Sequence, residues 1–134
     1  MFLGAAYFQL PPLLYAKKTG YFTITCDNVK NNPGHNIADK SYNVSTTNTE
    51  EILRIAQKEK IDGILAFGSD LSMITCAKVS NYMQLPGNTL STIEKMVYKS
   101  KFRKFLNDKR IEKVNYKVFS NYQKNDLVLK LSTI

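Results

Sequence analysis

The sequence predicts a three-layer α/β/α domain built on a parallel sheet of four to five strands. Strand-like runs rich in β-branched, aromatic and other apolar residues alternate four times with helix-like segments. Capping and turn residues mark the points where one kind of segment gives way to the other. Alternation of this kind requires right-handed crossovers that place helices on both faces of a parallel sheet.

Four strands are expected from the apolar runs, and each is followed by a turn residue or a polar residue. They cover residues 1–3, 21–26, 41–44 and 61–67. Residues 28–35 contain Asn-Asn-Pro-Gly and are predicted to form a loop. Residues 111–120 are compatible with either a strand or a linker.

The helices are predicted from their start and stop signals. Pro11 and Pro12 fit only the first turn of a helix, which Gly20 ends. Asn48 with Glu51 forms a capping box for the next helix. Three further helices are expected: one that Ser69 caps and that runs to about residue 83, one over residues 91–106 opened by a capping box of Ser91 and Glu94, and a short one over residues 122–131.

The charge of the chain is concentrated at one end. The net charge is +8 over 134 residues. Residues 1–94 hold eight basic and eight acidic residues, whereas residues 95–134 hold eleven and three. A basic segment of this kind fits a polyphosphate ligand, an acidic partner or a solvated helix face. It carries no nucleic-acid-binding motif, so no nucleic-acid partner is expected.

Several function classes are excluded by what the sequence lacks. No apolar run approaches the roughly 20 residues that cross a bilayer, so no membrane partner is expected. Cys26 and Cys76 form no CxxC pair and are interpreted as reduced thiols of a cytoplasmic protein. His35 is expected on a surface loop. No metal, paired-carboxylate or nucleophile-and-base pattern appears, so no catalytic or metal-binding residues are predicted.

The turn after the first strand departs from a dinucleotide-binding fingerprint. That fingerprint is GxGxxG, with an acidic residue at the end of the second strand. Here Gly4 is kept, but Ala6 and Gln9 stand where the other glycines would be. Asp27 does end the second strand. The sequence therefore offers only a weak signal for dinucleotide binding.

An ordered series of short stretches carries a resemblance to a known family. In chain order they are Gly4-Ala5-Ala6 with Gln9-Leu10, Lys17–Tyr21, Asp27 with Pro33-Gly34 and Ile37–Asp39, Thr49–Leu53, Lys60–Ile64, Ser69-Asp70 and Leu85–Gly87. Together they resemble the N-terminal, pre-ATP-grasp domain of ATP-grasp ligases, which is Rossmann-like. The most similar members are the carbamoyl phosphate synthase large subunit, the biotin carboxylases and the ATP-grasp enzymes of purine synthesis.

The resemblance implies a domain plan and an activity. Residues 1–106 would form the pre-ATP-grasp domain, and residues 107–134 a linker and the start of a truncated ATP-grasp domain. The parent enzyme would activate a carboxylate with ATP as an acyl phosphate, which an amine then attacks. Its later lobes would hold ATP and Mg²⁺, so this chain alone would be inactive and would bind neither tightly. The implied partners are those lobes and a small-molecule carboxylate substrate, and a homodimer is compatible with the resemblance.

The resemblance also implies two groups of site residues. Lys99 matches the family's basic residue near the start of the last helix before the ATP-grasp lobes, which contacts ATP phosphates, and Lys101 is the second choice. The residues implied to line the acceptor-substrate side of the cleft are Gly4, Ala5, Ala6, Gln9, Asp27, Ser69 and Asp70.

Two other functions remain open from the sequence. One is a stand-alone Rossmann-like module that binds a nucleotide or a nucleotide-sugar. The other is a scaffold or regulatory domain whose basic face docks an acidic partner.

Overall fold

The computed structural model describes residues 1–113, 115, 116 and 118. The chain forms two compact units, Met1–Val97 and Tyr98–Ile134, and each is described by itself. The domain boundary expected after residue 106 concerns the parent protein and stays a prediction. The helix expected over residues 122–131 lies outside the described residues, as does most of the segment 111–120.

The first unit is built on a parallel sheet of four strands, as the sequence predicts. The strands are β1 (Phe2–Leu3), β2 (Ile24–Asp27), β3 (Lys40–Asn43) and β4 (Leu65–Ala66), in the order β3-β2-β1-β4. Phe2 of β1 pairs with Thr25 on one side and with Leu65 on the other. Strands β2 and β4, which lie on either side of β1, are therefore reached by crossovers that run in opposite directions across the sheet.

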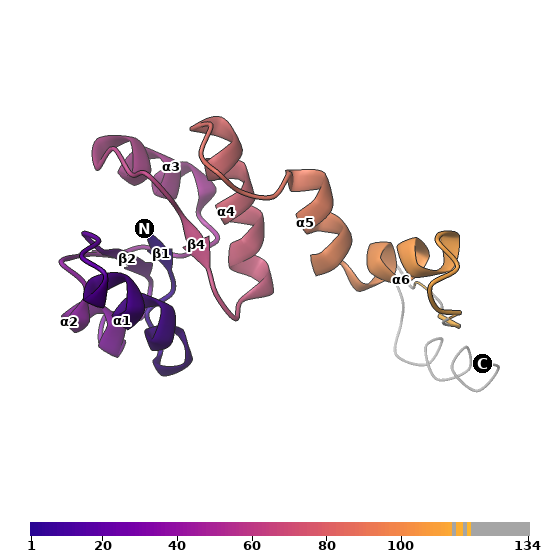
Figure 1. Cartoon of the computed structure of the whole chain (residues 1–134), viewed down its shortest axis with the longest axis horizontal. Helices are drawn as coiled ribbons and strands as arrows, with labels where there is room; N and C mark the ends of the chain where they lie inside the picture. Colours follow the sequence, from indigo (N-terminus) through magenta and orange to yellow (C-terminus); the bar gives the residue numbers. More distant parts are fainter. Residues whose placement is uncertain (114, 117, 119–134) are drawn as a thin grey trace, which may run out of the picture. The chain divides into compact units, whose positions relative to one another are not determined.

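Helices cover both faces of this sheet, so the unit has three layers (Figure 1). A 3₁₀ turn, η1 (Tyr7–Gln9), leads into α1 (Leu10–Lys18), which packs beside α2 (Pro33–Ile37). The helices α3 (Thr49–Lys58) and α4 (Asp70–Tyr82) pack together, and α5 (Leu90–Val97) packs on α4. Because the crossover from β3 to β4 runs opposite to the two before it, right-handedness places α3 on the face that α1 and α2 leave open.

The core lies between β1, β2 and the helices α3 and α4. Leu3 and Cys26 come from adjacent strands, and Ile52 and Ile55 come from one face of the strongly amphipathic α3. Val79 of α4 completes this cluster, and all five side chains are almost fully buried. Leucine and isoleucine burial of this kind contributes about 1.5–3 kcal/mol per side chain.

The strand expected over residues 61–67 is limited to Leu65–Ala66, and two helical regions differ from the sequence-based expectation. The loop expected over residues 28–35 contains the start of α2, because Pro33 occupies its first turn and Gly34 fits against the first strand's turn. The single basic helix expected over residues 91–106 is two helices, α5 and α6 (Lys99–Asp108), which Tyr98 separates in an extended conformation. The amide of Thr92 donates to Oγ1 of Thr89 at 3.2 Å, so the cap of α5 is Thr89 rather than Ser91.

Candidate functional site

The strand order places a crevice position at the carboxyl ends of β1 and β4. Crossovers from β1 run toward β2, and the crossover that enters β4 arrives on the other side of β1. Ligands of open α/β sheets bind where the strand order reverses in this way. The residues that follow β1 and β4, 4–9 and 67–70, meet at this edge of the sheet. They include six of the seven residues implied to line the substrate side, among them Asp70, the first residue of α4. The remaining one is Asp27.

The turn after β1 is held in place by glycine geometry. Gly4 has a φ of +110°, and its amide donates to the carbonyl oxygen of Cys26 at 2.8 Å. A Cβ at Gly4 would overlap the side-chain amide of Gln9. Only glycine therefore fits this position, for both its backbone conformation and its lack of a side chain.

The carboxylate of Asp27 accepts hydrogen bonds from the turn after β1 and from the loop that follows β2. Its Oδ2 accepts from the amide of Ala5 at 2.8 Å and from Nδ2 of Asn32 at 2.9 Å, and its Oδ1 accepts from the amide of Val29 at 2.8 Å. The residue is 7% exposed. The structure thus brings Asp27 to the site, with both carboxylate oxygens engaged inside the protein. Its contact with a substrate stays a prediction.

Gln9 connects the two strands at the crevice. Its Nε2 donates to the carbonyl oxygen of Phe67 at 3.1 Å and lies 3.4 Å from that of Leu3, and its Oε1 accepts from the amide of Ala6 at 3.0 Å. The side chain is buried. Gln9 therefore fastens the end of β4 to the turn after β1, a role that sequence reasoning did not assign. The signal was present as a long amide side chain at the third glycine position of the fingerprint.

Ser69 and Asp70 open α4 on the β4 side of the crevice. Ser69 occupies the N-cap position, but its hydroxyl lies 2.8 Å from Oγ of Ser72 instead of capping a backbone amide. Ser72 in turn donates to Oγ1 of Thr46 at 2.8 Å. Asp70 is exposed in the first helical turn, where a negative charge is favourable. Ser69 thus occupies the predicted N-cap position, but its side chain takes part in a series of hydroxyl contacts with Ser72 and Thr46 instead of capping the helix.

Exposed apolar side chains surround this edge, and sequence reasoning missed them. Tyr7 is 79% exposed, Phe8 58%, Phe67 46% and Leu71 69%. The ring of Phe8 lies against Gly68, where a Cβ would come within 3.0 Å of it. We call these four residues the apolar rim. Their strand-end and first-turn positions made each of them look like an ordinary core or turn residue in the sequence.

The two lysines predicted to contact ATP phosphates lie in the second unit. Lys99 is the first residue of α6 and is exposed. Nζ of Lys101 lies 5.0 Å from the ring centroid of Tyr98, in cation–π distance. The segment 98–113 carries seven basic and two acidic residues. The phosphate-binding role of both lysines stays a prediction.

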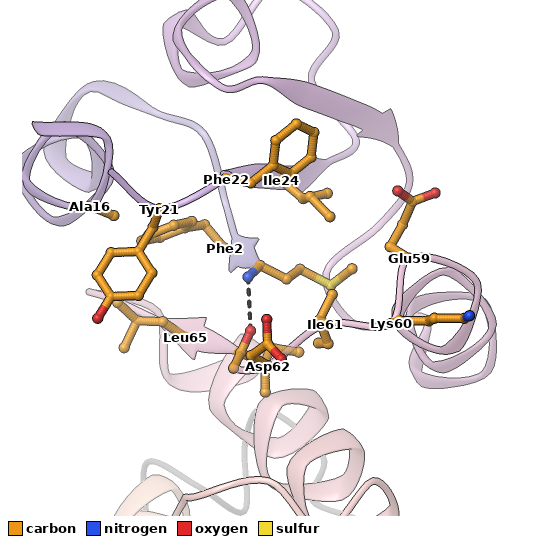
Figure 2. A pocket seen from close by; sticks show the side chains of 13 residues that line it. Phe2, Ala16, Tyr21, Phe22, Ile24, Glu59, Lys60, Ile61, Asp62 and Leu65 are labelled. Carbon is orange, nitrogen blue, oxygen red and sulfur yellow. Dashed lines mark hydrogen bonds between the residues drawn. The ribbon is translucent and has the colours of Figure 1, made fainter. Parts of the chain in front are cut away.

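A pocket of about 450 Å³ lies at the opposite edge of the sheet, near the amino ends of the strands (Figure 2). Tyr21, Phe22 and Leu65 contribute apolar walls. The amino group of Met1 donates to the carbonyl oxygen of Gly63 at 2.8 Å, and burial lowers the pKa of this ammonium. Strand topology favours the carboxyl edge as the ligand site, because the switch point and the predicted residues are both there.

His35 corrects one sequence-based expectation. It lies on α2, half-buried, instead of on a surface loop. Its Nδ1 is 2.9 Å from Oγ1 of the buried Thr25, and its Nε2 is buried and has no hydrogen-bond partner among the described residues. His35 is helical because Pro33 starts a helix where composition indicated a loop.

The two cysteines are free thiols, as the sequence indicates. Burial raises the pKa of Cys26 to about 12 and also raises the pKa of Cys76. Neither is therefore a ready nucleophile at neutral pH. Within the described residues, no group of three or more His, Cys, Asp or Glu is placed to hold a metal ion. No helix in the described part of the chain is long and apolar enough to cross a membrane.

The fold of this chain is similar to that of part of three solved enzymes. The chain superimposes on phosphoribosylglycinamide synthetase from Anaerococcus prevotii with a TM-score of 0.74 and 22% identity. The corresponding values are 0.72 and 20% for N5-carboxyaminoimidazole ribonucleotide synthetase from Thermotoga maritima, and 0.65 and 16% for L-amino acid ligase from Bacillus licheniformis. These enzymes are ATP-grasp ligases. The chain folds like part of an ATP-grasp ligase.

The matches cover nearly all of this chain but a minority of each neighbour. They span 99%, 98% and 98% of this chain, and 34%, 35% and 41% of the three enzymes in the same order. No protein-family model matches the sequence, and no curated protein matches it. The resemblance noted in the sequence is thus confirmed as a likeness of fold.

Proposed function

We propose that this chain is the N-terminal lobe of a larger ATP-grasp ligase and lines the acceptor-substrate side of its active site. The observation that carries the proposal is the assembled turn at the β1–β4 switch point. It lies in a fold that matches 34% of the length of an ATP-grasp enzyme. The parent activity is ATP-dependent carboxylate–amine ligation through an acyl phosphate. The narrower form of the proposal is a carbamoyl phosphate synthase-like enzyme in the cytoplasm.

The described residues fit a supporting role toward ATP. Phosphate groups are bound well by flexible ammonium groups acting as point charges, and Lys99 and Lys101 supply two of these on α6. Mg²⁺ takes oxygen ligands from one or two carboxylates and from substrate phosphates. In the proposed parent, later lobes hold the metal. ATP bound there would supply the phosphoryl group that activates the carboxylate.

The test is the reading frame beyond codon 134. The proposal requires a glycine-rich phosphate loop and a Glu/Asn metal pair downstream of Ile134. The extended protein should release ADP from ATP and Mg²⁺ when a carboxylate and an amine are both supplied, and the 134-residue chain should not. A continuation without those elements, or an extended protein that releases no ADP with any carboxylate–amine pair, contradicts the proposal.

The alternative of a stand-alone nucleotide or nucleotide-sugar binding module makes a different prediction. Such a module would bind NAD, ATP or a nucleotide-sugar at the first turn of the isolated chain. The amides of Ala5 and Ala6 are already donated to Asp27 and Gln9, which disfavours a pyrophosphate at this turn. Micromolar binding of NAD to the 134-residue chain, measured by calorimetry, would favour the module over the ligase lobe.

A further inference from the structure

Most of the backbone amides in the turn after β1 donate hydrogen bonds to acceptors within the protein. A turn that binds phosphate does so with free amides that point at the ligand. Five of the seven amides from residue 4 to residue 10 instead have acceptors within the chain. They belong to Gly4, Ala5, Ala6, Gln9 and Leu10, and their acceptors are, in order, O of Cys26, Oδ2 of Asp27, Oε1 of Gln9, O of Ala6 and O of Tyr7.

The helix that follows adds little to anion binding. Pro11 and Pro12 stand in the first turn of α1 and have no amide hydrogen. The positive end of a helix dipole acts on an anion mainly through such amides. The usual phosphate-binding device of this fold position is therefore absent from residues 4–12.

The charge and polarity at this edge point the same way. In the two segments that flank the switch point, residues 4–10 and 67–73, the sole charged residue is Asp70. It is exposed, and its carboxylate repels a phosphate and attracts an ammonium group. The other conspicuous solvent-facing groups are the four side chains of the apolar rim.

From these observations we propose that the amine acceptor lined by this lobe carries no phosphate at this edge. It presents an apolar group to the apolar rim, with its ammonium toward Asp70. The inference rests on the proposed function, since that function makes this edge the acceptor side, and it narrows the acceptor to apolar, unphosphorylated amines. Gln9 and Asp27 act as positioning residues, because they occupy the amides that a phosphate would need.

The experiment titrates three probes into the 134-residue chain and follows backbone amide shifts by NMR. The probes are L-leucinamide, glycinamide and ribose 5-phosphate. Leucinamide should shift the amides of residues 4–9 and 67–71 at about fivefold lower concentration than glycinamide, because burial of its side chain adds apolar contact to the same amine. Ribose 5-phosphate should leave these amides unchanged.

Two matched variants locate the effect. Phe8→Ser should remove the difference between leucinamide and glycinamide. Tyr15→Ser removes another exposed aromatic ring from the body of α1, 69% exposed against 58% for Phe8, and should preserve that difference. The dispersion of the amide spectrum reports whether each variant is folded, and if Phe8→Ser is not, Leu71→Ser serves as the second rim variant.

Three results would overturn the inference. Ribose 5-phosphate could shift the turn at or below the leucinamide concentration, glycinamide could match leucinamide, or no probe could shift the turn within its solubility. These titrations use only the 134-residue chain, whereas the proposed function is tested by the downstream reading frame and by ADP release. An extended protein that turns over ATP with a phosphorylated amine would leave the ligase standing and remove the present inference.

Discussion

Replacing Asp27 by Asn tests whether one carboxylate holds the crevice together. The substitution keeps the size of the side chain but replaces one acceptor oxygen by a donor. Whichever way the amide is oriented, it directs its NH₂ group at one or two of the three donors, which are the amides of Ala5 and Val29 and Nδ2 of Asn32. The bonds that remain also lose the assistance of the negative charge.

The magnitude follows from the burial and from the number of bonds. A hydrogen bond to a charged group contributes about 1.5–3 kcal/mol, a neutral one about 1 kcal/mol, and a buried orphaned donor costs about 1–3 kcal/mol. The free energy of unfolding should therefore fall by about 3 kcal/mol. With a urea dependence of about 2 kcal/mol per molar, the unfolding midpoint should fall by about 1.5 M.

The assay is urea unfolding followed by circular dichroism, with Asp70→Asn as the control. Both variants lose one negative charge, so their net charge is identical, but Asp70 is exposed and interacts mainly with the start of α4. The control should lose about 0.5 kcal/mol. If Asp27→Asn unfolds at the same urea concentration as Asp70→Asn, the carboxylate does not hold the turn and the reasoning fails.

Three further outcomes are expected. Cys26 and Cys76 should resist a thiol reagent at pH 8 in the native protein and react after unfolding; prompt reaction of Cys26 would contradict its burial. Hydrogen bonds from Lys17 and from the amide and hydroxyl of Thr23 lower the pKa of Asp39, so its contribution to stability is present above about pH 4 and is lost as the pH falls toward the lowered value. Thermal melts of wild type and Asp39→Asn should converge in acid, and a constant difference would refute the linkage. Gly34→Ala should lower the unfolding free energy by about 1–3 kcal/mol, since its Cβ would lie 2.8 Å from a turn carbonyl; an unchanged melt would show that the turn can move.

The sheet was predictable because its signals are local. An apolar run and the turn or polar residue after it mark each strand. Asn48 accepts from the amide of Glu51 at 3.2 Å as the first half of a capping box. The helix α2 was not predictable from composition, since Asn and Gly disfavour helices. It forms because Pro33 starts it and because the amide of Gly34 donates to the carbonyl oxygen of Ala5 at 2.8 Å. That contact is non-local, and propensity cannot report it.

For the candidate site, the location was predictable from the sequence, but the roles of its residues were not. Its location followed from the chain order, because strand ends and helix starts define where a parallel sheet meets its ligand. The roles within it did not follow. Whether Asp27 and Gln9 face a ligand or the protein depends on which hydrogen-bond partners lie beside them, and those partners come from segments up to 58 residues away. The exposure of Phe8 and Phe67 likewise depends on how the turn and β4 meet.

The amino end of β1 has a practical consequence for handling the protein. The nitrogen of Met1 takes the place of a backbone donor beside Gly63, and the residue is only 9% exposed. A purification tag joined to Met1 would convert its ammonium into an amide and would have to leave through the space that Phe22 and Asp62 border. A chain added before Met1 therefore has to cross this pocket, and the unfolding midpoints of tagged and untagged protein would show whether the edge of β1 tolerates it.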